Sequence, residues 1–114
     1  MHKSLVLLAL FATGALAQGQ YHVDVTDSAG RTITFYEYSG YRACYCLRNT
    51  QTYKIYNRDG GDVKLFSTSD CTGSYSQLAQ GKTQTNAQWV YSMSLGKSGI
   101  ASRDPTSCPN YFAQ

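Results

Sequence analysis

The sequence predicts an antiparallel all-β domain, a sandwich or a barrel, and three observations support this prediction. Apolar and polar residues alternate in several short runs, which is the pattern of strands with one buried face. Gly, Ser, Asn and Asp residues separate these runs at intervals of roughly 8–12 residues, as in small β-sandwiches and barrels. The chain of 114 residues has 10 Tyr and 15% charged residues, so its composition is that of one folded domain and not of a disordered chain.

The first half of the chain begins with a predicted β-hairpin. Val23 and Val25 alternate with polar neighbours, residues 27–30 have turn-forming side chains, and strict alternation resumes directly afterwards. The remaining predicted elements of this half are strands at residues 31–36, 43–47 and 52–56 and a strong turn at 57–62.

The second half contains two further predicted strands, at residues 63–66 and 89–95. In the second of these, alternation places Trp89, Tyr91, Met93 and Leu95 on one face. Residues 101–114 include both prolines of the chain and predict a loop that Cys108 holds in place. We therefore expect a β domain over residues 18–100, followed by this C-terminal tail.

Residues 1–17 have the organisation of an export signal. A short basic start precedes an apolar run over residues 5–12, and Ala15 and Ala17 give the small-x-small pattern that signal peptidase accepts. The run is shorter than the roughly 20 residues that a permanent membrane helix needs. We therefore expect a secreted, extracellular protein that begins near Gln18 and has no membrane span.

The four cysteines predict two disulfides, because an even number of cysteines in an exported chain is typical of a cross-linked domain. Cys44 and Cys46 are two residues apart in a predicted strand, so both point to the same face and are expected to bond elsewhere. Their partners are Cys71 and Cys108, in an order that the sequence leaves open. A zinc site is the alternative, but Cys-x-Cys is not the usual ligand spacing.

Two segments share an internal spacing at a constant offset of 30 residues. In each, a strand ends in an aromatic residue, and a fold-back and a small residue follow, which predicts two similar β-motifs around one core. The residues are Tyr36, Tyr41 and Ala43 in the first segment, and Phe66, Cys71 and Gly73 in the second.

On these residues the chain resembles the βγ-crystallin family over residues 31–97. That family builds each domain from two Greek-key motifs, each marked by aromatic-x4-aromatic-x-Gly, with a serine in the last strand that closes over the hairpin. The chain departs from the pattern at Cys71, where an aromatic is usual, and at Ala43, where glycine is usual. The resemblance implies a sandwich of two Greek-key motifs, with Ser92 or Ser94 as the closing serine of the second.

The resemblance also raises the question of calcium, which family members often bind through an acidic pair, Asn/Asp-Asn/Asp, just before a Ser/Thr-Ser step in the last strand. The corresponding pairs are residues 48–49 in the first motif and 87–88 or 89–90 in the second, and none contains a carboxylate. The acidic turn at 59–62 is interpreted as a solvated hairpin turn. We therefore expect no strong calcium site and no other cofactor.

The sequence offers little material for catalysis. After residue 17 it has one histidine, His22, and one glutamate, Glu37. A hairpin that brought these two together beside an arginine would give the acid–base pair of a small secreted ribonuclease, which is the leading enzymatic alternative. The formal net charge of +3 does not predict a nucleic-acid-binding protein.

The candidate binding surface is the predicted turn at residues 39–40. Tyr38, Tyr41 and Arg42 flank this turn, and exposed tyrosine and arginine side chains are typical of protein and glycan contacts. The other tyrosines are explained by the preference of aromatic residues for strands.

The favoured hypothesis is therefore a secreted, non-enzymatic binding module whose partner is an unidentified protein or glycan. Because small microbial members of the resembled family include toxins and protease inhibitors, an antagonistic role is the sharper form of this hypothesis. The alternatives are a small secreted hydrolase and a structural extracellular protein.

Overall fold

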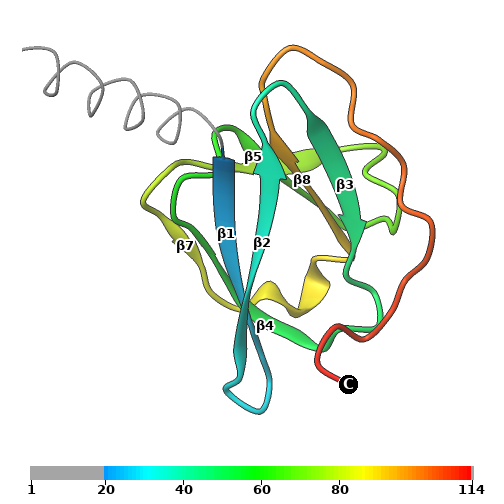
Figure 1. The fold of residues 1–114 in the computed structure, drawn as a ribbon. Coiled ribbons are helices and arrows are strands. Elements are labelled where there is room, and N and C mark those ends of the chain that lie inside the picture. The colour runs from blue at the N-terminus through cyan, green and yellow to red at the C-terminus, as the bar shows by residue number, and fades with distance from the viewer. Residues whose placement is uncertain (1–19, 114) are drawn as a thin grey trace, which may run out of the picture.

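The computed structural model describes residues 20–113 as two four-stranded antiparallel sheets that face each other (Figure 1). The predicted all-β sandwich is thus confirmed. The expected export signal, residues 1–17, lies outside the described residues. Within residues 20–113, no helix is long and apolar enough to cross a membrane.

The first sheet has the order β2-β1-β4-β7, and the second has the order β3-β8-β5-β6. The strands of the first sheet are β1 (Gln20–Asp27), β2 (Thr32–Tyr38), β4 (Thr52–Asn57) and β7 (Thr83–Gln84). Those of the second are β3 (Arg42–Cys46), β5 (Val63–Phe66), β6 (Tyr75–Leu78) and β8 (Ser92–Gly96).

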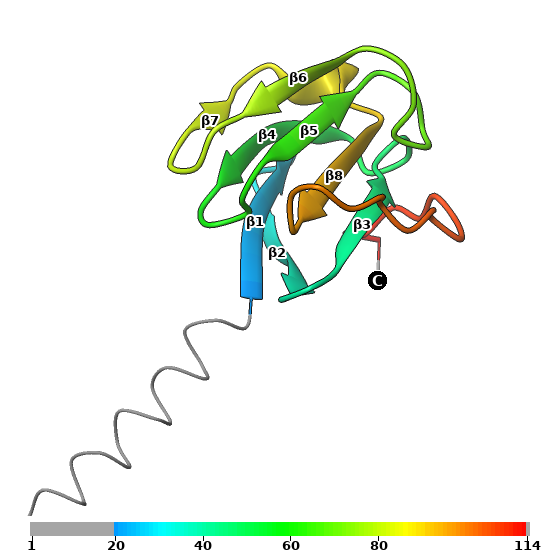
Figure 2. The ribbon, with the colours of Figure 1, turned by 90° about the horizontal axis from the view of Figure 1, so that it is seen from above.

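Each sheet contains one strand from the other half of the chain. Strand β3, from the first half, pairs with β8 in the second sheet, and β7, from the second half, pairs with β4 in the first sheet (Figures 1 and 2). In reverse, the second order is β6-β5-β8-β3, so β5 has the position of β1 and β6 has the position of β2. The Greek-key assignment itself stays a prediction.

This correspondence bears on the internal spacing match, which aligned Tyr36 with Phe66. Tyr36 lies in the edge strand β2 and is exposed, whereas Phe66 lies in the central strand β5 and is buried. The offset of 30 residues therefore does not relate equivalent positions of the two sheets. A strand that ends in an aromatic residue has the same local pattern at an edge and in the centre of a sheet, and only pairing distinguishes them.

The core lies between the sheets and comes from the alternating residues of the central strands. Cross-strand neighbours such as Val25 and Ile55 in the first sheet, and Leu65 and Met93 in the second, are fully buried. Burying one such side chain stabilises the fold by about 1.5–3 kcal/mol. The other large aliphatic side chains that are fully buried are Leu47, Val23, Val63, Val90 and Leu95.

The predicted strand at residues 89–95 is wrong in its first half. A short 3₁₀ helix, η1 (Ala87–Trp89), precedes the strand, which begins only at Ser92. Met93 and Leu95 are fully buried as expected, but Trp89 and Tyr91 are exposed. Strand β8 lies between β3 and β5 and all five of its residues are buried, so its alternation of apolar and serine residues does not mark a solvent face.

Both disulfides connect β3 to other parts of the chain, in the order that the sequence left open. Cys44 bonds to Cys71 in the β5–β6 connection, and Cys46 bonds to Cys108 in the C-terminal tail. The tail is also held by main-chain hydrogen bonds between Arg103 and the edge of β3, from Cys44 N to Arg103 O and from Arg103 N to Arg42 O. Main-chain hydrogen bonds as well as the disulfide therefore attach the tail, up to residue 113, to the domain.

Candidate functional site

The two residues of the enzymatic alternative do not meet. His22 is the cross-strand partner of Tyr36, so Glu37, the next residue of β2, points to the opposite face of the sheet. His22 lies within β1, and its Nδ1 is 2.9 Å from Asp59 Oδ1. The described residues therefore do not form the His–Glu pair that a ribonuclease of this size would need.

Glu37 is buried and forms an ion pair with the exposed side chain of Arg103. Its carboxylate accepts a hydrogen bond from Arg103 Nη2 at 2.7 Å, and the Tyr45 hydroxyl lies 3.2 Å from Glu37 Oε1. Burial, and then the negative charge of Glu37, raises the pKa of Tyr45 to about 12. Tyr45 thus stays a neutral phenol at physiological pH, and Glu37 ties β2, β3 and the tail together.

The predicted binding residues Tyr38 and Tyr41 are exposed, at 53% and 54% of their surface. Tyr41 N donates to Tyr38 O at 3.1 Å across the turn, where Gly40 has a φ of 89° that an L side chain rarely adopts. Tyr36, also exposed, packs edge-to-face on Tyr38 with ring centroids 5.5 Å apart. The turn thus separates Tyr38 from Tyr41, and Tyr36 packs beside Tyr38.

The third predicted residue, Arg42, does not belong to this surface, because it is only 4% exposed. Its guanidinium donates to Ser94 Oγ at 2.7 Å, to Gly96 O at 3.0 Å and to Asp62 O. Burial lowers the pKa of Arg42. The side chain is therefore a structural link between the two halves of the second sheet.

The exposed cation beside the tyrosines is Arg103, which sequence reasoning missed. Its guanidinium carbon lies 5.7 Å from the centre of the Tyr41 ring, within cation–π range. The sequence around Arg103 contains no motif that predicts this position. Arg103 lies beside Tyr41 only because the tail pairs with β3. Tyr36 and Tyr38 lie on the face of β2 opposite to Glu37, whereas Arg103 pairs with Glu37, so these residues flank the turn from two sides. We refer to Tyr36, Tyr38, Tyr41 and Arg103 together as the tyrosine surface.

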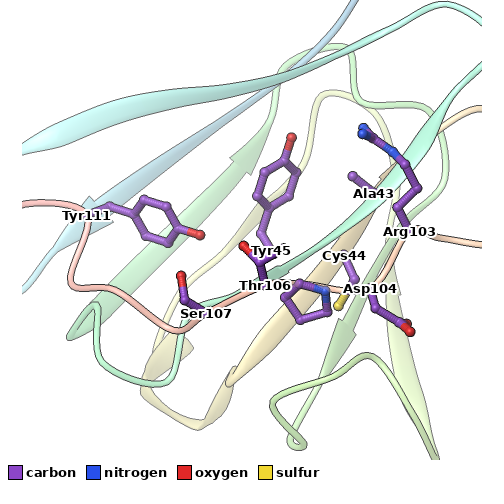
Figure 3. A pocket seen from close by; sticks show the side chains of 9 residues that line it. Ala43, Cys44, Tyr45, Arg103, Asp104, Thr106, Ser107 and Tyr111 are labelled. Atoms are coloured by element: carbon purple, nitrogen blue, oxygen red, sulfur yellow. The ribbon is translucent and has the colours of Figure 1, made fainter.

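A pocket of about 230 Å³ lies beside the tyrosine surface, between β3 and the tail. Figure 3 shows the Tyr45 and Tyr111 rings in this tail pocket, with Ser107 close to Tyr111 and Arg103 at the other end. Burial raises the pKa of Tyr111, so this phenol is also neutral at physiological pH. The volume is below the roughly 300–1,000 Å³ of typical small-molecule sites, and it suits one protein side chain or one sugar ring.

Of the two candidate closing serines, Ser92 is the one that contacts the β5–β6 connection. Its hydroxyl accepts a hydrogen bond from Cys71 N at 2.9 Å and donates to Thr68 O at 2.6 Å. Ser94 instead accepts from Arg42. Ser92 therefore fixes the loop that also carries the Cys44–Cys71 disulfide.

Three of the positions compared with calcium ligands, Arg48, Gln88 and Val90, line a second pocket of about 270 Å³. Arg48 and Thr52 from the first half and Gln88 and Val90 from the second line it together, and none of the residues around it is acidic. A guanidinium at the rim disfavours a divalent cation, which prefers carboxylate oxygens. Elsewhere in residues 20–113, no group of three His, Cys, Asp or Glu side chains is placed to hold a metal.

No protein-family model, curated protein or solved structure matches the chain. The resemblance to βγ-crystallins therefore stays a prediction that depends on the short sequence motifs.

Proposed function

We propose that the protein is a secreted, disulfide-stabilised binding module without catalytic activity, and that its partner docks on the tyrosine surface. The exposed rings of Tyr36, Tyr38 and Tyr41 around one rigid turn carry this proposal. Tyrosine and arginine are the residues most often found as energetic hot spots of interfaces. A tyrosine side chain also loses little conformational freedom on binding, because it has only two rotatable angles.

The partner that the surface favours is a protein. The tyrosines project from a turn and the neighbouring edge strand, and the adjacent tail pocket has room for one side chain of a partner. A standard protein interface covers about 800 Å² on each side, so a protein partner would also cover residues around the tyrosine surface and the tail pocket. An antagonistic role, as in the toxins and inhibitors of the resembled family, is the sharper form of this proposal.

Two further observations support a binding role in preference to hydrolysis. His22 and Glu37 point to opposite faces, and Glu37 is already neutralised by Arg103. Both cysteine pairs are oxidised, so no thiol remains as a nucleophile in the described chain. The disulfides and the expected export signal agree with an extracellular location.

Affinity capture with matched variants tests the proposal. The mature protein is immobilised and exposed to a panel of extracellular proteins and to a glycan array, beside the variant Tyr38→Ser/Tyr41→Ser. The control is Tyr75→Ser on β6, because Tyr75 is 50% exposed and packs against a cation, Lys64, as Tyr41 does against Arg103. We expect specific capture of a protein that the double variant loses and the control keeps.

Three outcomes would overturn parts of the proposal. Equal capture by the double variant would show that the partner binds another surface. Capture of a glycan alone would show that the partner is a carbohydrate and not a protein. RNA cleavage by the wild type that is lost in His22→Ala would show that the protein is an enzyme.

A further inference from the structure

Strand β2 has a long free edge. It is the outermost strand of the first sheet and, within the described residues, pairs with β1 alone (Figure 1). It has seven residues, whereas β6 and β7, at two other sheet edges, have four and two, and the tail covers the outer edge of β3. Natural proteins usually shorten or cover a strand edge, because it is a template for pairing with another chain.

The main-chain groups of β2 point alternately to β1 and to this free edge. His22 N donates to Asp59 Oδ1, and His22 O accepts from Asp59 N at 3.0 Å, so both groups point to the β4 side of β1. Tyr36, the cross-strand partner of His22, therefore directs its own N–H and C=O away from β1. By the same alternation, the main-chain groups of Thr32 and Thr34 also point to the free edge.

These edge groups are available to a partner strand. Tyr36 O accepts a hydrogen bond from the Tyr45 hydroxyl at 3.2 Å, and the other edge groups of Thr32, Thr34 and Tyr36 have no hydrogen-bond partner within residues 20–113. All three residues are exposed. The edge therefore offers alternating donors and acceptors in the arrangement that an extended chain completes.

The tail runs along the inner face of β2 and leaves the edge open. Arg103 pairs with Glu37 at 2.7 Å, and the Tyr111 ring packs edge-to-face on Phe35 with centroids 4.8 Å apart. Glu37 and Phe35 are the inward-facing residues of β2, so these contacts do not involve the edge groups. Arg103 and Tyr111 also line the tail pocket, which places its 230 Å³ beside the inner face of this strand (Figure 3).

We propose that the partner adds an extended strand to the free edge of β2, and this proposal rests on the proposed function. Alternate residues of the added strand bond to Thr32, Thr34 and Tyr36 and place their side chains on the outer face, beside Tyr36 and Tyr38. The residues between them direct their side chains to the inner face. There the tail pocket accepts one aromatic side chain, which packs on the rings that line it.

Hydrogen exchange of the free protein tests whether the edge is open. The amides of Thr32, Thr34 and Tyr36 should exchange at least about tenfold faster than those of Ile33 and Phe35, which bond to β1. Sedimentation gives the oligomeric state of the same sample. Slow exchange in a monomer would show that the chain itself covers the edge, and slow exchange in a dimer that a second copy does. Either result overturns the proposal.

A synthetic peptide tests strand addition on the wild-type protein. The probe is acetyl-Lys-Thr-Val-Thr-Phe-Thr-Val-Thr-Lys-amide, an alternating sequence in which the threonines face β2 and the phenylalanine enters the tail pocket. Its binding should protect the amides of Thr32, Thr34 and Tyr36 from exchange. N-methylation of the threonine before the phenylalanine should weaken binding at least about tenfold, because it removes an N–H that bonds to β2. N-methylation of the phenylalanine, whose N–H points away, should leave the affinity unchanged.

Protein variants test the edge and the pocket separately. Thr34→Pro removes the central N–H of the edge without removing a hydrogen bond to β1 and should weaken the peptide at least about tenfold, whereas Gln77→Pro on β6 should not. Ser107→Trp, at an exposed position of the pocket wall, should weaken the peptide but not its analogue with alanine in place of phenylalanine. If Thr34→Pro does not fold, the two N-methyl peptides still decide on the wild type.

The proposal is overturned if the peptide does not bind, if the two N-methyl peptides bind alike, or if the methylated phenylalanine is the weaker one. These results are distinct from failure of the proposed function. A protein whose capture requires Tyr38 and Tyr41 but leaves the edge amides of β2 unprotected would refute strand addition alone. Absence of any capture that depends on Tyr38 and Tyr41 would refute the proposed function, whatever the peptide does.

Discussion

Removal of the Cys46–Cys108 disulfide should destabilise the domain more than removal of Cys44–Cys71. The disulfides span 62 and 27 residues respectively. A cross-link stabilises a protein mainly by restricting the unfolded chain, and the chain-entropy relation gives about 4.3 kcal/mol for the longer loop and about 3.6 kcal/mol for the shorter one. Loss of Cys46–Cys108 also removes one attachment of the tail, whose Phe112 packs on the core, and this enlarges the difference.

Urea unfolding of the two double variants, Cys44→Ala/Cys71→Ala and Cys46→Ala/Cys108→Ala, measures these free energies against the wild type. For a domain of this size, a loss of 1 kcal/mol lowers the melting temperature by about 4–8 °C. Both variants should therefore melt at least about 14 °C below the wild type, by calorimetry. If the shorter loop proves the costlier to open, or if both losses stay below about 1 kcal/mol, restriction of the unfolded chain is not what these cross-links contribute.

Three further results are expected. Burial opposes ionisation of Asp27, but hydrogen bonds from Arg31 hold the pKa of Asp27 below its ordinary value; its contribution to stability is therefore complete above about pH 4 and lost as the pH falls through the folded pKa. Urea unfolding across the acid range should show a weaker acid dependence for Asp27→Asn, and an unchanged one would refute this. Because burial and Glu37 raise the pKa of Tyr45 to about 12, the folded protein keeps a proton that the unfolded chain releases near pH 10. The stability of the wild type, measured by thermal unfolding, should therefore fall as the pH rises from about 10 to about 12. The same fall in Tyr45→Phe would contradict the assignment. Calcium or a chelator should leave the melting temperature unchanged, and a rise with calcium would reveal a site that the sequence did not predict.

The sequence predicted those strands whose side chains alternate between core and solvent. The runs around Val25, Ile55 and Leu65 are strands with these residues buried. Strands β6 and β7 were not predicted, because they are short, lie at the edges of their sheets and are mostly exposed. Their strand conformation comes from pairing with β5 and β4, which no local pattern encodes.

The sequence could predict only the part of the candidate site that is formed by residues of a single turn. Tyr38 and Tyr41 flank the same Gly40 turn, so their exposure follows from adjacent residues. The burial of Arg42 and the arrival of Arg103 depend on where strand β8 and the tail pack, at more than 50 residues' separation. The partners of Cys44 and Cys46 are long-range in the same sense, and local spacing left both pairings open.

Site-specific photo-crosslinking tests most directly whether a partner docks on the tyrosine surface. A photoreactive phenylalanine analogue replaces Tyr38, Tyr41 or, as the control on β6, Tyr75, and each protein is irradiated with its captured partner. Covalent adducts from positions 38 and 41, with none from position 75, are the predicted result. Adducts from position 75 alone, or from none of the three positions, would contradict the proposed binding surface.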